Sequence, residues 1–158
     1  MAVRRNKIFI TKKIYFITFT ILGWKKVFTN DKYCQPVYKW FDYIKEEYSN
    51  KIYSYVIMSI HIHLLTYISN RSPKISTLIM NAKRFIAYDM VDLLEEDKQY
   101  DLLDFFKANA NTKNKAKHKV FTDRYDLLII ESEKFFRQKL NYIHSNPCQA
   151  HWQLAHNP

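Results

Sequence analysis

The sequence predicts an α+β fold in which an antiparallel sheet of four strands carries helices on one face. Two observations predict it. Segments rich in β-branched and aromatic residues alternate with segments whose apolar residues recur at helical spacing. The 158 residues are also enough to bury one core, so we expect a single domain over residues 1–158.

The first expected strand covers residues 12–24, which are rich in Ile, Tyr, Phe and Thr. A helix is expected over residues 30–50, with Pro36 near its start, because proline is tolerated in the first turn. The apolar residues of this segment have helical spacing and are Val37, Trp40, Phe41 and Ile44.

Two more strands are expected at residues 51–58 and 61–69. Only Ser59 and Ile60 lie between them, which predicts a tight hairpin, although neither residue is favoured in the usual two-residue turns.

A second long helix is expected over residues 72–97, with Ser72 as N-cap and Pro73 as its first helical residue. Residues 98–110 either continue this helix or form a short one. The expected buried face of the long helix comprises Ile75, Leu78, Ile79, Ala82, Phe85 and Ile86.

The remaining segments are a polar, basic loop (111–119), a strand or an irregular segment ending in a strand (120–130), and a helix (131–150) capped by Ser132. The resulting order is β-α-β-β-α-β-α. Its first six elements match the ferredoxin-like pattern, and the last helix is an addition.

The charge balance indicates the kind of partner. The chain has 25 Lys and Arg residues against 15 Asp and Glu, a net charge of +10. Such an excess favours a polyanion, with nucleic acid the first expectation and an anionic membrane surface the second. Gly23 is the one glycine, which argues against a glycine-rich phosphate loop.

The sequence favours a cytoplasmic protein without a membrane span. The apolar run at residues 14–22 is too short to cross a bilayer and is preceded by Lys12 and Lys13. Cys34 and Cys148 are far apart and form no motif, so free thiols in a reducing compartment are expected.

The stretch YVIMSIHIHLL (residues 55–65) places His61 and His63 one residue apart in an expected strand. Alternate residues of a strand share a face, so both imidazoles point the same way, with Cβ atoms about 7 Å apart, while Ile62 and Leu64 face the core. Two neutral imidazoles at this separation can bind one divalent metal ion. They could equally be half-buried sheet residues with satisfied hydrogen bonds, and the spacing alone does not decide.

The last expected helix carries a polar set of side chains. Tyr142 projects away from the buried stripe, on a face shared with Gln138, Lys139 and Asn146. Pro147 disfavours helical geometry at the residue before it, so we expect the helix to end at Asn146. Since the chain has 12 tyrosines, this spacing alone indicates no role for Tyr142. The expected stripe comprises Phe136, Leu140 and Ile143.

Two stretches resemble a known family. YVIMSIHIHLL resembles the His-hydrophobic-His block of the REP-associated tyrosine transposases, the single-tyrosine branch of the HUH transposases, and NYIHSNPCQA (141–150) resembles the block that holds their tyrosine. YFITFTILGWKKVFT (15–29) and KVFTDRYDLLII (119–130) also look like family segments in the right order. The resemblance covers about residues 14–150.

The resemblance implies that a divalent ion, Mg²⁺ or Mn²⁺, is held by His61, His63 and Asn146, and that Tyr142 is the nucleophile. Such an enzyme nicks and rejoins single-stranded or hairpin DNA through a covalent 5′-phosphotyrosine. The family fold is ferredoxin-like, in agreement with the order of elements.

This chain departs from the family pattern at several positions. Ile60 replaces a polar residue, Phe121 replaces a tryptophan, and Cys148 follows the Asn-Pro pair where the family has valine. The sequence ends at Pro158, before the usual C-terminal block of the family, which indicates a truncated or decaying copy.

Cationic side chains are the expected DNA contacts, because they grip phosphates without reading sequence. The alternative for the loop lysines is a solvated turn. The candidates lie in the basic loop, on the second long helix and on the last helix, and are Lys113, Lys115, Lys117, Lys119, Lys83, Arg84 and Lys139.

Three functions remain open at this point: a transposase, a nucleic-acid-binding module that has lost catalysis, and a metal-dependent hydrolase that uses water. A monomer with its own tyrosine at the site and a swapped homodimer are both compatible with the sequence.

Overall fold

A computed structural model describes residues 11–111, 113 and 116–146. Its strands are β1 (Lys13–Thr20), β2 (Lys51–Ile57), β3 (His61–Ile68) and β4 (Asp126–Ile130). Its helices are the 3-10 helix η2 (Leu22–Trp24), α1 (Asp31–Tyr48), α2 (Ile75–Glu96), α3 (Tyr100–Ala108) and α4 (Glu133–Ser145).

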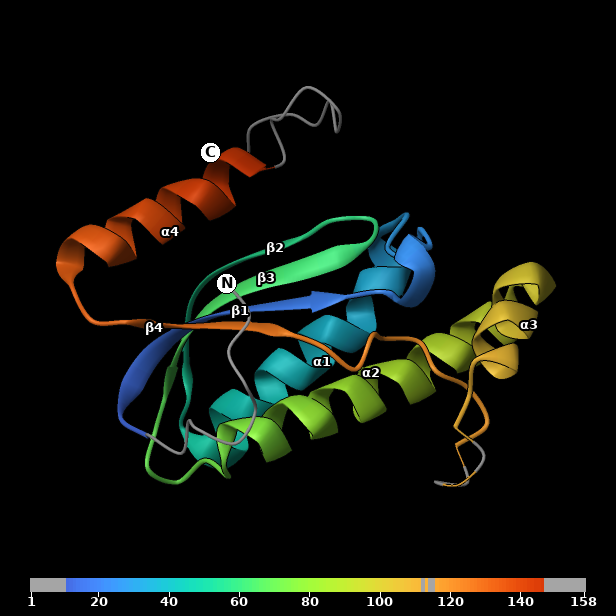
Figure 1. Cartoon of the computed structure of the whole chain (residues 1–158), viewed down its shortest axis with the longest axis horizontal. Helices are drawn as coiled ribbons and strands as arrows, with labels where there is room; N and C mark the ends of the chain where they lie inside the picture. The colour runs from blue at the N-terminus through green and yellow to red at the C-terminus, as the bar shows by residue number, and fades with distance from the viewer. Residues whose placement is uncertain (1–10, 112, 114–115, 147–158) are drawn as a thin grey trace.

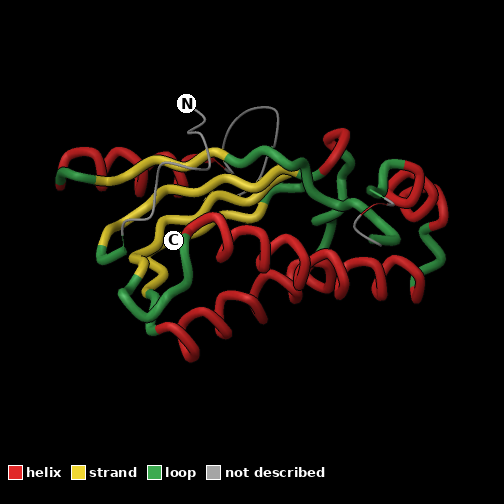
Figure 2. The backbone as a smooth tube through the Cα atoms, turned by 60° about the horizontal axis from the view of Figure 1, so that its bottom comes forward, coloured by secondary structure: helices red, strands yellow, loops and turns green. Residues whose placement is uncertain are grey.

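The four strands form one antiparallel sheet in the order β2-β3-β1-β4, which confirms the ferredoxin-like topology. Helices α1 and α2 cover one face, and α4 crosses the opposite face (Figure 1). The strands lie side by side with the expected twist (Figure 2).

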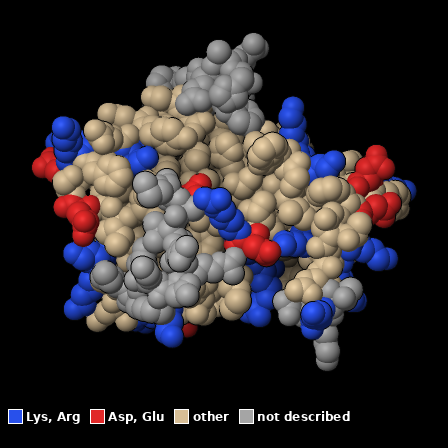
Figure 3. Space-filling model, viewed as in Figure 1, with Lys and Arg blue, Asp and Glu red and all other residues tan. Residues whose placement is uncertain are grey.

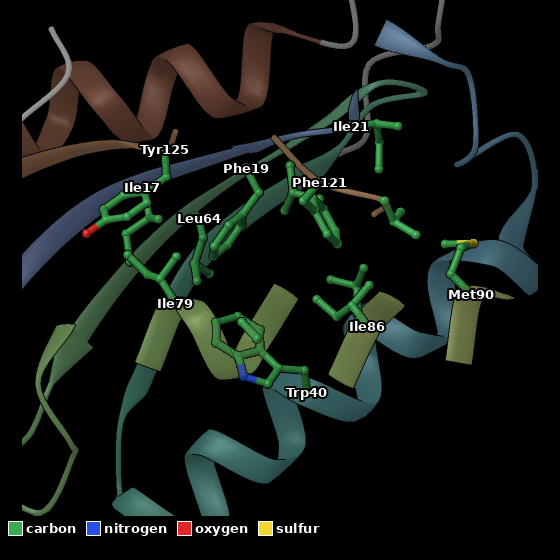
Figure 4. Close-up of a cluster of buried hydrophobic side chains, with 14 of the residues drawn as sticks. Ile17, Phe19, Ile21, Trp40, Leu64, Ile79, Ile86, Met90, Phe121 and Tyr125 are labelled. Carbon is green, nitrogen blue, oxygen red and sulfur yellow. The ribbon is translucent and has the colours of Figure 1, made fainter. Parts of the chain in front are cut away.

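The main core lies between the sheet and the α1–α2 layer. Tyr15, Ile17 and Phe19 of β1 point into it, and Phe19 packs edge-on against Trp40 of α1 (Figure 4). From α2 the core receives five of the six residues expected on its buried face, namely Ile75, Leu78, Ile79, Ala82 and Ile86. The expectation for Phe85 was wrong, because this ring is 44% exposed and packs on Tyr43 of α1.

A smaller apolar cluster holds α4 on the other face of the sheet. Ile143 of α4 is fully covered, and Phe136 and Leu140 are partly buried against the cluster, as the stripe predicted. A register shift in β2 between Ile52 and Ser54 helps, because it leaves Tyr53 in edge contact with Phe136. The cluster comprises Phe16, Val56, Met58, Leu65, Ile130 and Ile143.

The N-terminus of α4 is capped as expected, because Ser132 Oγ accepts a hydrogen bond of 3.1 Å from the Phe135 N–H. The helix ends at Ser145, and Asn146 follows as its C-cap. Asn146 nonetheless has α-helical backbone angles (φ −55°, ψ −46°), which the proline argument did not predict. Pro147 and Cys148 lie outside the described residues.

Some element boundaries differ from the expectations, and two open alternatives are resolved. Pro36 stands in the sixth position of α1 rather than at its start, since α1 begins at Asp31. Helix α2 begins at Ile75 with Lys74 as N-cap, so the assignment of Ser72 and Pro73 was wrong. Residues 98–110 form a separate short helix, α3, and residues 120–130 are irregular with a strand at their end.

The β2–β3 hairpin explains how Ser59 and Ile60 serve as turn residues. Neither has a positive φ, so the turn is not one of the primed types that require glycine or asparagine. The β1–α1 loop supports the turn instead, because Val27 N–H and Phe28 N–H both donate to the Ser59 carbonyl.

Cys34 is a free thiol, as expected, and burial raises its pKa to about 11. Among the described helices, none has both the length and the apolar character needed to cross a membrane.

Candidate active site

The two histidines share one face of the sheet, as their alternation in β3 predicted, and α4 covers this face. The register pairs Thr18 of β1 with His63 and Thr20 with His61. Thr18 Oγ1 lies 2.9 Å from His63 Nδ1, so the central strand β1 fixes the orientation of this ring. Phe16 of β1 stacks on the same ring with centroids 5.4 Å apart.

His63 is held as a neutral imidazole. The residue is 6% exposed, and burial lowers its pKa to about 3, with repulsion by His61 and Lys139 adding to the effect. Its Nε2 is buried and has no hydrogen-bond partner within the described part of the chain. A buried polar nitrogen without a partner is costly, and metal binding is one way in which a protein satisfies it.

The donor set fits a divalent ion. The His61 and His63 rings lie with centroids 4.6 Å apart at 58° to each other, and the Nε2 of His61 is also buried. If Nδ1 of His63 carries the proton and donates to Thr18, its Nε2 lone pair is available for a metal. No cluster of three His, Cys, Asp or Glu side chains occurs in the described residues, so a third ligand drawn from these residues would be of another type. Asn146 is of such a type and is 3% exposed.

Tyr142 lies beside the histidine pair within the same chain. Its ring meets the His63 ring edge-on at 5.3 Å between centroids, and the Phe16 ring at 5.8 Å. The side chain is 41% exposed, so the phenol borders both the imidazole and solvent. Asn146, which is itself buried, lies one helical turn beyond Tyr142 as the C-cap of α4.

Lys139 is the expected DNA contact that lies at this site. It stands one turn before Tyr142 on α4, and its Nζ is 5.2 Å from the centroid of the Tyr142 ring. Helix α4 is held over the sheet by the apolar cluster and by a contact of 3.4 Å between Ser54 Oγ and His144 Nε2.

The other expected DNA contacts that the structure describes lie elsewhere. Lys83 and Arg84 belong to α2, on the opposite side of the sheet from α4 (Figure 1). Lys83 Nζ donates to the carbonyls of Thr122 and Asp123 at 2.7 and 3.1 Å. Lys119 Nζ forms an ion pair of 2.8 Å with Asp123.

The basic loop adjoins α3 rather than α4. Lys117 lines an open hollow of about 800 Å³ beside Tyr100 and His118, Lys113 is exposed, and Lys115 lies outside the described residues. On the face seen in Figure 3, basic and acidic side chains are interspersed both at the outline and near the centre, and the described residues in this view form no single basic patch.

Sequence reasoning missed Phe16 and Thr18. Both lie in the stretch 15–29 that resembles a family segment, but that resemblance assigns them no role. Their contacts with His63 follow from the β1–β3 register, which the sequence does not reveal. The alternation of β1 predicts that both residues lie on one face of the sheet, but it does not predict which residues of β3 lie opposite them.

Two solved structures share this fold over nearly the whole chain. A REP-associated tyrosine transposase bound to a REP hairpin aligns with a TM-score of 0.64 at 16% identity, over 96% of this chain and 76% of that one. A Deinococcus radiodurans R1 protein provisionally assigned as a transposase aligns with a TM-score of 0.55 at 14% identity, over 97% of this chain and all of that one. No protein-family model and no curated protein matches the sequence significantly. The chain is therefore similar in fold to these transposases.

Proposed function

We propose that this protein is a transposase that nicks and rejoins single-stranded or hairpin DNA through a covalent 5′-phosphotyrosine on Tyr142. The observation that carries the proposal is the edge contact at 5.3 Å between the half-exposed Tyr142 ring and the buried ring of His63, whose Nε2 lacks a partner in the described residues. A nucleophile and a potential metal ligand from segments about eighty residues apart thus share one site.

The reaction would use Tyr142 as follows. Its hydroxyl oxygen forms a bond to the scissile phosphorus while the bond to the 3′ oxygen breaks, and the phenolic proton is balanced by the proton that the free 3′-hydroxyl gains. The phosphotyrosine keeps the phosphodiester energy, so the 3′-hydroxyl of another strand can reverse the step. The docking of α4 on the sheet keeps the ring beside His63 for such an attack.

The residues present fit a divalent metal, Mg²⁺ or Mn²⁺, which His61, His63 and Asn146 would hold. When bound, the ion would neutralise charge that develops on the phosphate. Burial keeps His63 neutral and therefore able to bind it at physiological pH.

Two further observations support a DNA substrate. The net charge of +10 favours a polyanion, and the similar REP-associated tyrosine transposase was solved with a REP hairpin bound. A hairpin with a single-stranded flank is therefore the substrate class that we propose for this chain.

The test is a denaturing gel after incubation with 5′- and 3′-labelled hairpin DNA and Mn²⁺. We expect a protein–DNA adduct that carries the 5′-phosphate side of the nick, and its loss in Tyr142→Phe and in EDTA. Tyr100→Phe is the matched control, because Tyr100 is 60% exposed and lies on α3.

Two outcomes would contradict the proposal. Binding without any adduct would favour the module that has lost catalysis. Cleavage that survives Tyr142→Phe would favour a hydrolase that uses water.

A further inference from the structure

The ammonium group of Lys139 rests on a cluster of aromatic rings at the edge of the candidate site. Its Nζ lies 4.8 Å from the centroid of Phe16, 5.6 Å from Phe135 and 5.2 Å from Tyr142. Phe135 and Tyr142 flank Lys139 on α4 at helical spacing, while Phe16 comes from β1. The ring that it touches on its C-terminal side belongs to the proposed nucleophile.

Several other cations among the described residues are already engaged by oxygen atoms. Lys83 donates to backbone carbonyls, and Lys32, Lys39 and Lys119 pair with aspartates. Lys139 differs, because in the described residues no carboxylate lies within ion-pair distance of it. The contacts found for its ammonium group within the described part of the chain are with the three rings.

A cation held by ring faces is ready to receive an anion. The attraction between an exposed ammonium and a ring is weak, whereas a charge-assisted hydrogen bond to a phosphate oxygen is among the stronger polar contacts. The rings also cover the apolar stem and limit its rotamers, so less entropy is lost when the phosphate arrives.

We propose that Lys139 binds the scissile phosphate and positions it against the Tyr142 hydroxyl. This role rests on the proposed function and specifies one contact of its substrate. A non-bridging oxygen accepts a hydrogen bond from Nζ, which fixes the phosphorus beside the phenol and offsets the repulsion between a phosphodiester and an anionic attacker.

The variants for the test are Lys139→Met, which keeps the stem and removes the charge, and Lys139→Arg, which keeps the cation. Lys134→Met is the matched control, because Lys134 is an exposed lysine on the same helix. Melting curves for each variant check the fold. Adduct formation is timed on hairpin DNA with Mn²⁺, and binding is measured over a range of salt concentrations in the Tyr142→Phe background.

We expect Lys139→Met to slow adduct formation about ten- to a hundredfold. The slope of the logarithm of the DNA-binding constant against the logarithm of the salt concentration should become shallower by about the contribution of one phosphate contact. Lys139→Arg should restore most of the rate, and Lys134→Met should change neither quantity. On DNA with a neutral methylphosphonate at the scissile position, wild type and Lys139→Met should react at equal rates, because the charge that Lys139 contacts is gone.

The proposal is overturned if Lys139→Met behaves like Lys134→Met, or if its rate defect is equally large on methylphosphonate DNA, which would indicate a structural role. If wild type forms no adduct at all, the proposed function fails. The role of Lys139 in phosphate binding is then tested by the salt dependence of DNA binding alone. A reduced slope in Lys139→Met would still support phosphate binding, and an unchanged slope would overturn it.

Discussion

Replacing His63 and its partner together should stabilise the metal-free protein while abolishing activity. The perturbation is the double substitution Thr18→Val with His63→Leu. It removes the Nε2 that lacks a partner in the described residues, and it removes both members of the hydrogen bond between Thr18 Oγ1 and His63 Nδ1. Leucine in place of a side chain that is 6% exposed extends the apolar cluster around Phe16 and Leu65.

The magnitude follows from two contributions. A buried polar atom without a partner costs about 1–3 kcal/mol, and its removal recovers this amount. Replacing both partners of a buried hydrogen bond by apolar groups of similar shape is nearly neutral. The double variant should therefore gain about 1–3 kcal/mol, and in a chain of this size each kcal/mol raises the melting temperature by about 2–4 °C.

The assay is thermal unfolding in EDTA, followed by circular dichroism, for wild type, His63→Leu and the double variant. His63→Leu alone should gain less, because the hydroxyl of Thr18, which is 8% exposed, then loses its partner. In buffer without EDTA, added Mn²⁺ should raise the melting temperature of wild type only, by mass action on the folded state. A metal-free double variant less stable than wild type would refute the reasoning about Nε2.

Three further outcomes follow from the same structure. The pKa of His63 is about 3 in the folded protein and 6.5 in the unfolded chain, so between these pH values the unfolded chain binds a proton that the folded protein does not. Lowering the pH below 6.5 should therefore destabilise wild type more than the double variant, by up to about 1.4 kcal/mol per pH unit. Urea titrations of both proteins at pH 7 and pH 5 measure this difference. Gly23→Ala should lower the free energy of unfolding by about 1–3 kcal/mol, because Gly23 has φ +66° and an added Cβ would lie 2.6 Å from Phe105 Cζ. An unchanged midpoint in the urea titration would contradict this. Ser132→Ala should lower the free energy of unfolding by about 1 kcal/mol, because the hydrogen bond that caps α4 is lost, whereas Ser132→Asp should keep a capping oxygen and the stability. Equal melting temperatures for the two variants would count against the cap.

The sequence predicted the order of elements well because periodicity reports which side chains are buried. It failed where tertiary contacts override local signals. Ser72 and Pro73 form a good helix start, yet the Ser72 N–H bonds to the Ser69 carbonyl, in a turn that Asn50 anchors through the Ser69 N–H, so α2 begins later. The first strand ends at Thr20 rather than at residue 24, since Gly23 and Trp24 adopt positive φ angles in η2.

The candidate site was predictable only in part, for a related reason. A period of two residues guarantees that His61 and His63 share a face, whatever the rest of the fold. The contact of Tyr142 with His63 depends instead on how α4 docks on the sheet, through Ile143 and the shifted register near Tyr53. The apolar stripe predicts which face of α4 is buried but not where on the sheet the helix lies, so only the resemblance to a family pointed to Tyr142.

The position of Tyr142 also bears on whether one chain can act alone. Because its ring touches His63 of the same chain, we expect catalysis in cis, with a rate of adduct formation per protein that is independent of protein concentration. Mixing Tyr142→Phe with His63→Leu then restores no adduct, since neither chain holds an intact site. If α4 were exchanged between protomers, one of the two sites in a mixed dimer would be complete, and the mixture would recover up to about a quarter of wild-type activity, as random pairing of equal amounts allows. Recovery at that level, appearing only after the two proteins have been unfolded and refolded together, would show that the tyrosine is supplied by a neighbour.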